Sequence, residues 1–367
     1  MGSKQKADRG YDYILLVPTL VLMVVGLVAI YSASSFLAQH RWGDSYFYLK
    51  RQGMFCLLGL GLMIVAKNIP TAVYRKMTYP VLLLSMALLM LLLIPGISPK
   101  VGGSSRWLKF GGFSFQPSEF AKLSLSIYIA YSMAKKGPQM GAFSRGFLPH
   151  LLVSGTFMTL ILLQPDLGTS VIIGCWVLVL LFVGGVNLLQ LFLTLILFAP
   201  IVFWLTWQAD YRWKRWSAFL NPWEDPDGLG FQIVHSFLAF GSGGLLGVGL
   251  GNSKQKLFYL PEPHTDFILA ILGEELGLVG LSVVITLFGV LIVRGIKIAL
   301  NAHEIYDTYL AAAISMMMGL QVLVNMGVVL GLLPTKGLTL PLISYGGSSL
   351  VITLFGIGIL LKISSAR

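Results

Sequence analysis

Long apolar segments limit most strongly what this chain can fold into. A membrane helix needs about 20 mostly apolar residues, and the sequence contains about ten runs that approach this length. They lie near Tyr13–Ser34, Gly53–Lys67, Tyr79–Pro95, Phe120–Met133, Phe147–Leu163, Val171–Gly185, Leu188–Trp207, Phe267–Leu300, Thr308–Leu332 and Leu350–Lys362. Several are expected to extend into their flanks, and the eighth is long enough to be tilted or broken. The pattern predicts an all-α polytopic membrane protein with about ten transmembrane helices.

Composition supports this class. Hydrophobic residues make up 56% of the chain and charged residues only 11%, whereas a soluble domain carries about 25% charged residues. The formal net charge of +11 suits partners with phosphate or anionic lipid head groups, including membrane lipids. Because the basic residues are scattered through short loops, we expect no nucleic-acid partner.

Loop charge indicates the orientation. Ten spans place both termini on one side, and the short loops on that side are richer in Lys and Arg, which favours N-in and C-in. Residues 1–12 then form a cytoplasmic tail, and residues 13–367 form a single membrane domain. Between the seventh and eighth helices, residues 208–266 form a large extracytoplasmic (periplasmic) loop.

Two charged residues fall near the fourth apolar run. Ionisable groups inside a span are costly, so each is a functional candidate. Glu119 and Lys122 are three residues apart, which places them on one helix face where they can pair. A plain helix start capped by Ser118 would explain Glu119, but it would not explain a lysine among apolar neighbours.

A carboxylate opens the eighth run, in the segment Pro261-Glu262-Pro263-His264-Thr265-Asp266. A positioned carboxylate that takes a proton from a sugar hydroxyl contributes roughly 10²–10⁴ in rate. The alternative of a simple helix cap stays open. His264 has no HExxH or paired Cys/His spacing, so no metal site is predicted.

Three further patterns concern the backbone and the outer surface. Pro334–Leu338 and Ser344–Ser349 have the composition of a re-entrant loop, which membrane depth tolerates only when the loop is buried or lines a cavity; a simple interhelical loop is the alternative. Glu274 and Glu275 cannot share one helix face, so at least one needs a polar partner. With the N-terminus inside, these clusters, Arg106-Trp107 and Gln164–Thr169 all lie on the outer side.

These motifs together resemble one known family, the SEDS proteins (shape, elongation, division and sporulation; FtsW, RodA and SpoVE). The resemblance covers nearly the whole chain after its N-terminal tail. It is carried, in family order, by Arg106-Trp107, Gln116-Pro117-Ser118-Glu119, Gln164-Pro165-Asp166-Leu167-Gly168-Thr169, His264-Thr265-Asp266-Phe267 and Ser344-Tyr345-Gly346-Gly347-Ser348-Ser349. Division-branch (FtsW-like) rather than elongation-branch features are Asn221-Pro222-Trp223, Gly249–Ser253 with Gln255-Lys256, and Pro334–Gly337. Pro263 departs from the expected alanine.

The resemblance implies a peptidoglycan glycosyltransferase that polymerises lipid II into glycan strands for the division septum. Asp266 becomes the general base on the acceptor 4-hydroxyl, and the growing glycan on undecaprenyl pyrophosphate is the donor. Arg106, Lys122 and Lys336 become partners of the pyrophosphate, and Glu119 orients Lys122. The other expected substrate-binding residues are His264, Thr265, Ser344 and Ser348. A divalent cation (Mg²⁺ or Mn²⁺) could share the work, although no dedicated ligand set is visible.

The resemblance also implies partners and a place. A class B penicillin-binding protein, the FtsI-like transpeptidase, is expected to bind, together with FtsQ, FtsL and FtsB. The location would be the bacterial inner membrane, with the active site on the periplasmic face. Two other functions remain open: a lipid II flippase, which needs a polar path to both faces, and a non-catalytic scaffold that recruits the transpeptidase.

Overall fold

The computed structural model describes residues 11–98, 104–110, 113–256 and 262–365. Ten of its helices follow the ten apolar runs. They are α1 (Tyr13–Trp42), α2 (Phe47–Asn68), α4 (Thr78–Leu91), α5 (Pro117–Lys136), α6 (Leu148–Leu162), α7 (Leu167–Val183), α8 (Leu188–Trp207), α11 (Ile268–Leu300), α12 (Ile305–Val329) and α13 (Gly347–Ser364). Within the described residues, seven helical segments are long and apolar enough to cross a membrane, and α4 and α7 are shorter apolar helices. The predicted polytopic helical fold is confirmed.

The tenth helix, α5, has a different composition because it carries Glu119, Lys122 and several serines. It is buried along most of its length and packs against α4 and α12. Polar side chains at membrane depth are tolerated where they face the interior of the bundle. The least apolar of these ten helices is therefore buried inside the fold.

Short elements complete the described chain. They are α3 (Thr71–Lys76), β1 (Leu108–Phe110), β2 (Phe113–Phe115), the 3-10 helix η1 (Gly137–Gly141), the π-helical turn η2 (Phe143–Phe147), α9 (Asp210–Leu220) and α10 (Phe231–Gly243). β1 and β2 form an antiparallel hairpin with Leu108 opposite Phe115, which the sequence did not predict.

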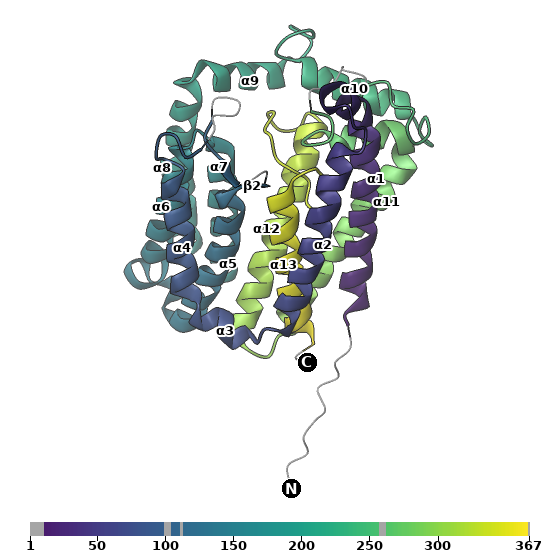
Figure 1. Ribbon diagram of the computed structural model, residues 1–367. Helices are drawn as coiled ribbons and strands as arrows, with labels where there is room; N and C mark the ends of the chain where they lie inside the picture. Colours follow the sequence, from purple (N-terminus) through teal and green to yellow (C-terminus); the bar gives the residue numbers. More distant parts are fainter. Residues whose placement is uncertain (1–10, 99–103, 111–112, 257–261, 366–367) are drawn as a thin grey trace.

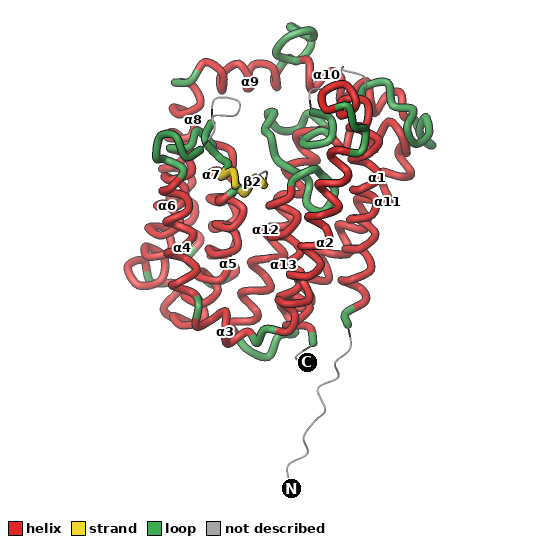
Figure 2. Tube along the Cα trace, viewed as in Figure 1, coloured by secondary structure: helices red, strands yellow, loops and turns green. Residues whose placement is uncertain are grey.

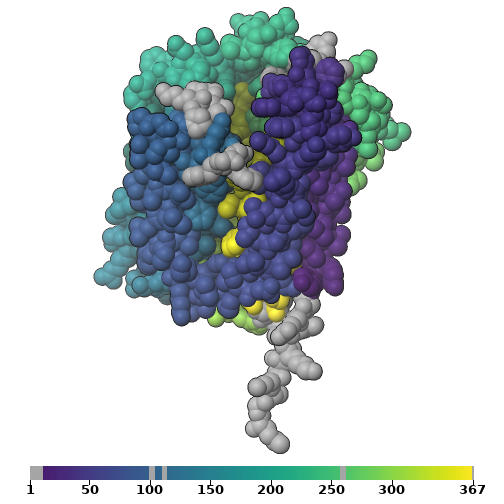
Figure 3. Space-filling view, in the orientation of Figure 1, coloured from purple at the N-terminus to yellow at the C-terminus, as the bar shows by residue number. Residues whose placement is uncertain are grey.

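The helices form two groups with α12 between them. In Figure 1, α4 to α8 stand on one side, and α1, α2, α11 and α13 stand on the other. α12 packs against both α11 and α5, so it joins the groups. The tube in Figure 2 shows α9 crossing the end of the bundle, above the space between the groups. The space-filling view in Figure 3 shows the surface hollowed between α2 and α4, with α13 at the back of the hollow.

The ends of the helices agree with an even number of spans. α1 begins and α13 ends at the same end of the bundle, while α9 and α10 lie at the opposite end (Figure 1). The long segment between α8 and α11 is therefore on the side away from both termini. Which side faces the cytoplasm stays a prediction from loop charge.

The long eighth run is broken, as its length suggested. At Gly277, α11 departs from helical geometry (φ 65°, ψ −169°), and the chain between α10 and residue 249 fills the break. Four backbone hydrogen bonds join the two: Val248 N to Glu274 O, Gly249 N to Glu275 O, Leu278 N to Gly244 O and Val279 N to Leu245 O. Glycine is needed because a Cβ on Gly247 would lie 2.2 Å from the carbonyl oxygen of Glu275. The glycine-rich stretch Gly241–Gly251 therefore holds a close contact between two backbone segments.

Candidate active site

Asp266 lies two residues before α11, at the end of the bundle that carries α9 and α10. Its carbonyl oxygen accepts a hydrogen bond of 3.0 Å from the side-chain amide of Asn325 on α12, and the same amide donates to the carbonyl of Leu338 at 2.6 Å. One side chain thus joins the Asp266 segment to the loop between α12 and α13. A Cβ on Gly337 would lie 2.8 Å from Oδ2 of Asp266, so the carboxylate faces the backbone next to Lys336.

The surroundings of Asp266 change its acidity. Burial raises the pKa of Asp266 to about 6, although a hydrogen bond from Thr265 and the charges of Arg215 and Lys336 act in the opposite direction. A carboxylate with this pKa is mostly ionised at neutral pH, yet it is a better proton acceptor than an ordinary aspartate. The raised pKa is suited to a general base, and this role of Asp266 stays a prediction.

Arg106 and Lys336 meet at a third residue, Asp166, although they come from loops far apart in sequence. Nε of Arg106 is 3.5 Å from Oδ2 of Asp166, and Nζ of Lys336 is 3.9 Å from Oδ1. Lys336 also donates to the hydroxyl of Thr169 at 3.2 Å. Burial favours the neutral form of Asp166, but Lys336 and Arg106 outweigh it and hold its pKa below the usual value. The carboxylate is a fixed negative charge between two cations.

The charged form of Lys336 is disfavoured by burial and by nearby cations. Burial lowers the pKa of Lys336 to about 7, the attraction of Asp166 opposes this shift, and the charges of Lys122 and Arg106 add to it. Three cations therefore act on one region that holds too little negative charge to balance them. An anion bound there would be attracted by all three and would restore the charge of Lys336.

Glu119 and Lys122 pair as their spacing predicts, with 2.7 Å between Oε1 and Nζ, and both side chains are buried. They line a cavity of about 50 Å³ between α5, α12 and α13. Ser126 and Gln321 add polar atoms, and the remaining wall is mostly apolar. The cavity combines a charged pair with a surface suited to hydrocarbon.

His264, an expected substrate-binding residue, is enclosed by aromatic side chains. Its ring is 1% exposed and packs against the rings of Tyr48 and Tyr345, with centroids at 4.3 and 5.5 Å. Burial lowers the pKa of His264 to about 4 despite the attraction of Glu262, so the ring is neutral. A neutral, enclosed ring supports the loop that carries Asp266, and the expected role of His264 in substrate binding stays a prediction.

Two of the predicted serines also serve the backbone. Ser344 donates to the carbonyl of Thr265 at 2.7 Å and accepts from the backbone N–H of Leu340 at 2.8 Å. Ser348 accepts from the backbone N–H of Gln116 at 3.0 Å. Both side chains are buried. Ser344 and Ser348 thus join loops through their hydroxyl groups. Their expected contact with substrate stays a prediction, as does that of His264.

Thr265 is less enclosed than His264, Ser344 and Ser348. It is partly exposed, and its hydroxyl donates to the carbonyl of Glu262 at 2.8 Å. Its expected role in substrate binding stays a prediction. The loop formed by residues 331–346 is buried along its second half and bonded to the Asp266 segment, so the predicted packing of this loop into the protein is confirmed.

Three residues of this region were not singled out from the sequence. Asp166 stood inside a quoted motif, and its position before an apolar run signals a helix cap, but nothing in the sequence pairs it with Arg106 and Lys336. Asn325 looks like an isolated polar residue in α12. Arg215 belongs to the long loop, and its influence on Asp266 depends on how that loop folds.

A protein-bound metal finds no support in the side chains. In the described parts of the chain, no three His, Cys, Asp or Glu side chains converge in a way that could hold a metal ion. Participation of a divalent cation in the reaction stays a prediction.

Comparison with known proteins identifies a family and individual proteins that this chain resembles. A sequence model of the family described as cell cycle protein, that of FtsW, RodA and SpoVE, matches residues 13–367. A probable peptidoglycan glycosyltransferase FtsW of Geobacter sulfurreducens (strain DL-1 / KN400) is 47% identical over 365 residues, which cover 100% of this chain and 98% of the relative. Stage V sporulation protein E of Bacillus subtilis (strain 168) is 44% identical and covers 96% of each chain.

Solved structures agree in fold. A chain of a peptidoglycan synthase complex, described for its coordination of polymerization and crosslinking, superposes with a TM-score of 0.79 at 29% identity, covering 97% of this chain and 98% of the other. The rod shape determining protein RodA of Thermus thermophilus gives 0.71 at 29% identity, covering 96% and 97%.

Proposed function

The chain belongs to the FtsW, RodA and SpoVE family of cell cycle proteins, and on this premise we propose that it is a peptidoglycan glycosyltransferase. Its substrate would be lipid II, polymerised into glycan strands during septal cell-wall synthesis. Relatives that share 42–47% of their residues over the full length are named as probable peptidoglycan glycosyltransferases. The observation that carries the proposal is the carboxylate of Asp266, with its raised pKa, beside a group of unbalanced cations.

Asp266 acts on the acceptor in this proposal. It takes the proton of the 4-hydroxyl of the terminal sugar, whose oxygen then attacks the anomeric carbon of the donor glycan. The bond from that carbon to the pyrophosphate breaks, and undecaprenyl pyrophosphate leaves with the electron pair. Base and leaving group lie on opposite faces of the sugar, so the anomeric configuration inverts, as in inverting glycosidases.

Cations stabilise the leaving group in this proposal. Negative charge grows on the pyrophosphate as the bond breaks, and cations already in place lower the energy of that state, above all where water is partly excluded. Arg106, Lys122 and Lys336 supply this charge, and Glu119 orients Lys122 through their 2.7 Å ion pair. The apolar wall of the cavity beside that pair suits the polyprenyl chain.

Two observations support the proposed location and partner: the helix topology, and a structural relative that belongs to a peptidoglycan synthase complex. With both termini in the cytoplasm, Asp266 lies at the periplasmic face of the inner membrane. The structural relative belongs to a complex of polymerization and crosslinking, which supports a class B penicillin-binding protein of the FtsI kind as partner. FtsQ, FtsL and FtsB at the division septum complete the proposal.

Polymerisation of labelled lipid II tests the function. The purified protein with its transpeptidase partner should make polymer, and Asp266→Asn should make none while still binding the partner. Asp44→Asn is the matched control, because the side chain of Asp44 is exposed and bonds to Lys50 and to the backbone N–H of Tyr46. Equal polymer from Asp266→Asn and wild type would remove Asp266 from the mechanism. If no protein makes polymer although the partner is bound, the flippase or scaffold function becomes the better explanation.

A further inference from the structure

The half-helix that follows Asp266 needs support from outside. Ile268–Leu276 is cut off from the remainder of α11 by the break at Gly277. An unbroken helix would transmit its position along the whole bundle, but a half-helix takes its position from whatever packs against it. The orientation of Asp266 therefore depends on contacts of Ile268–Leu276.

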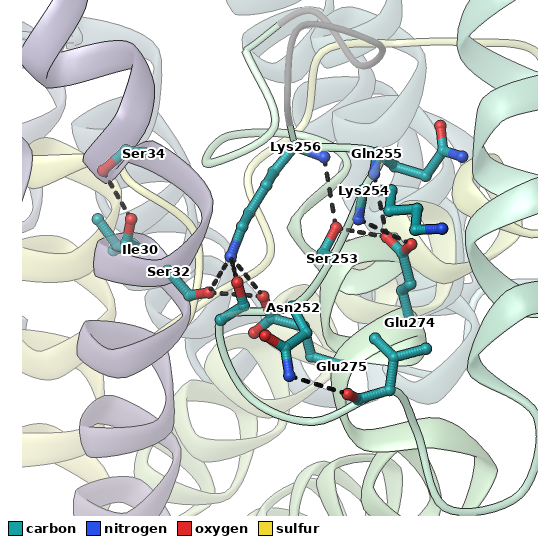
Figure 4. A network of polar contacts seen from close by, with 12 residues as sticks. Ile30, Ser32, Ser34, Asn252, Ser253, Lys254, Gln255, Lys256, Glu274 and Glu275 are labelled. Carbon is teal, nitrogen blue, oxygen red and sulfur yellow. Dashed lines mark hydrogen bonds and ion pairs between the residues drawn. The ribbon is translucent and has the colours of Figure 1, made fainter.

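Glu274 provides the first of these contacts. Its carboxylate accepts hydrogen bonds from the backbone N–H groups of Lys254 and Gln255, at 3.0 and 3.3 Å, and a short one from the hydroxyl of Ser253. Figure 4 shows these donors converging on the carboxylate from the turn that follows the glycine-rich segment. The hydroxyl of Ser242 on α10 lies 3.3 Å from Oε1 and adds a further donor, so the buried charge is held by one short turn and by α10.

Glu275, the adjacent acid, points to a different set of groups. Nζ of Lys256 lies 3.0 Å from its Oε1 and 3.1 Å from the hydroxyl of Ser32 on α1, and it donates to the carbonyl of Gly251 at 2.6 Å. Ser32 itself donates to Glu275 at 2.6 Å. An ammonium group has three donors, and all three are used here (Figure 4). We call Ser32, Lys256 and Glu275 the latch.

The ion pair of the latch is buried, and burial makes each of its charges depend on the other. The side chains of Lys256 and Glu275 are 9% and 1% exposed, so neither charge is solvated by bulk water, and each depends on the other. Oε2 of Glu275 is buried with no hydrogen-bond partner among the described residues. Loss of Lys256 would therefore leave the carboxylate with only the hydroxyl of Ser32.

The latch joins the half-helix to α1, which is bonded to α11 and to the Asp266 segment elsewhere. At the start of α1, Asp12 pairs with Arg294 at 2.9 Å, and near its end Arg41 pairs with Glu262 at 2.8 Å. α1 is a continuous helix of 30 residues, so it offers a fixed reference over the length in which α11 is interrupted.

We infer that Lys256 is a positioning residue for the transfer reaction, which fixes the first half of α11, and with it Asp266, against α1. This inference rests on the proposed function. Because a displacement of about 1 Å at a reacting group can cost roughly 10²-fold in rate, a loose half-helix would slow the chemical step more than it weakens substrate binding.

The first test replaces Lys256 in the full chain with its transpeptidase partner. In lipid II polymerisation, Lys256→Met should lower kcat by about tenfold or more and change KM by less than about twofold, and Lys256→Arg should recover part of the loss. Lys254→Met is the matched control, since Lys254 contacts Glu274 only through its backbone N–H and its side chain is exposed. Equal kcat for Lys256→Met and Lys254→Met would overturn the inference, as would a raised KM with unchanged kcat.

The second test loosens the latch without leaving a charge unpaired. Ser32→Ala removes the hydrogen bonds of Ser32 with Glu275 and Lys256 and should lower kcat by roughly fivefold at most, with an unchanged KM. Ser34→Ala is its control, because the hydroxyl of Ser34 bonds only to the carbonyl of Ile30 in its own helix (Figure 4). Identical kcat for the two alanine variants would overturn the inference. Absence of polymer from the wild type would instead overturn the proposed function itself.

Discussion

At the scale of single residues, the candidate site brings together two groups whose pKa values move towards each other. Burial raises the pKa of Asp266 to about 6 and lowers the pKa of Lys336 to about 7. In each case the uncharged form is favoured because the group has lost water. Because burial brings both pKa values close to neutral pH, the charges of Asp266 and Lys336 change with pH and with a bound substrate.

The pH profile of the reaction should show both groups. We expect kcat/KM for lipid II to rise with pH through about 6, as Asp266 loses its proton, and to fall above about 7, as Lys336 loses its charge. Rates measured between pH 5 and 9 would show the two limbs. Lys336→Arg keeps the cation at high pH, so it should remove the alkaline limb and leave the acid limb. An alkaline limb that does not move in this variant would assign it to another group.

Asp166 should control the charge of Lys336. Asp166→Asn removes the attraction that raises the pKa of Lys336, and we expect the alkaline limb to move to lower pH. Asparagine caps a helix about as well as aspartate, so the thermal midpoint should change little. Asp166→Ala also loses the bond to the N–H of Thr169 and should lower stability by about 1 kcal/mol. If both variants lose equal stability, the cap and the charge have not been separated.

At the scale of elements, the unusual feature is a helix whose interruption is filled by another part of the chain. The break and the segment that fills it depend on each other. The carbonyl groups of Glu274 and Glu275, which the break at Gly277 leaves without helical partners, accept hydrogen bonds from the N–H groups of Val248 and Gly249. Unpaired backbone groups at membrane depth would cost several kcal/mol each. Glycine permits the close approach that these bonds require.

Alanine in this contact should be destabilising. Gly247 has φ +80°, and a Cβ there would lie 2.2 Å from the carbonyl oxygen of Glu275. We expect Gly247→Ala to lower the thermal midpoint of the purified protein by several degrees. Gly241→Ala is the control, because Gly241 is helical in α10 and an added Cβ meets nothing within 4 Å; it should leave the midpoint unchanged or raise it slightly. Equal midpoints for both variants would argue against the tight contact.

At the scale of the whole molecule, the fold sorts the chain by polarity. Large apolar side chains remain exposed along α8 and on the outer sides of α1, α2 and α11, where a bilayer would cover them. The charged pair Glu119 and Lys122 lies inside, and the candidate base lies at one end. Such an arrangement is suited to a substrate with a lipid tail and a polar head.

Orientation can be tested by labelling single cysteines. In a background that lacks Cys56 and Cys175, Glu224→Cys lies between α9 and α10, and Arg145→Cys lies in η2, between α5 and α6. With a cytoplasmic N-terminus, an impermeant maleimide added to right-side-out vesicles should label position 224 at once. Position 145 should react only after permeabilisation. The reverse pattern would show that the charge rule was misapplied to this chain.

The sequence by itself determined the class of fold and much of the list of candidate residues. Apolar runs report membrane helices because lipid demands apolar side chains and internal hydrogen bonds, so the ten helices could be predicted, and the length of the eighth run left it either tilted or broken. The Glu119–Lys122 pair followed from helical periodicity. The motif resemblance brought in Asp266 as a base, a role that still awaits its experiment.

Only the tertiary structure decided which of these residues share surroundings. Asp166 between Arg106 and Lys336, Asn325 between Asp266 and Leu338, and Lys256 between Glu275 and Ser32 are contacts across tens to hundreds of residues. Likewise, the enclosed positions of His264, Ser344 and Ser348 became evident only in three dimensions. Local periodicity carries no information about such contacts, because they depend on how helices and loops pack once the membrane has aligned them.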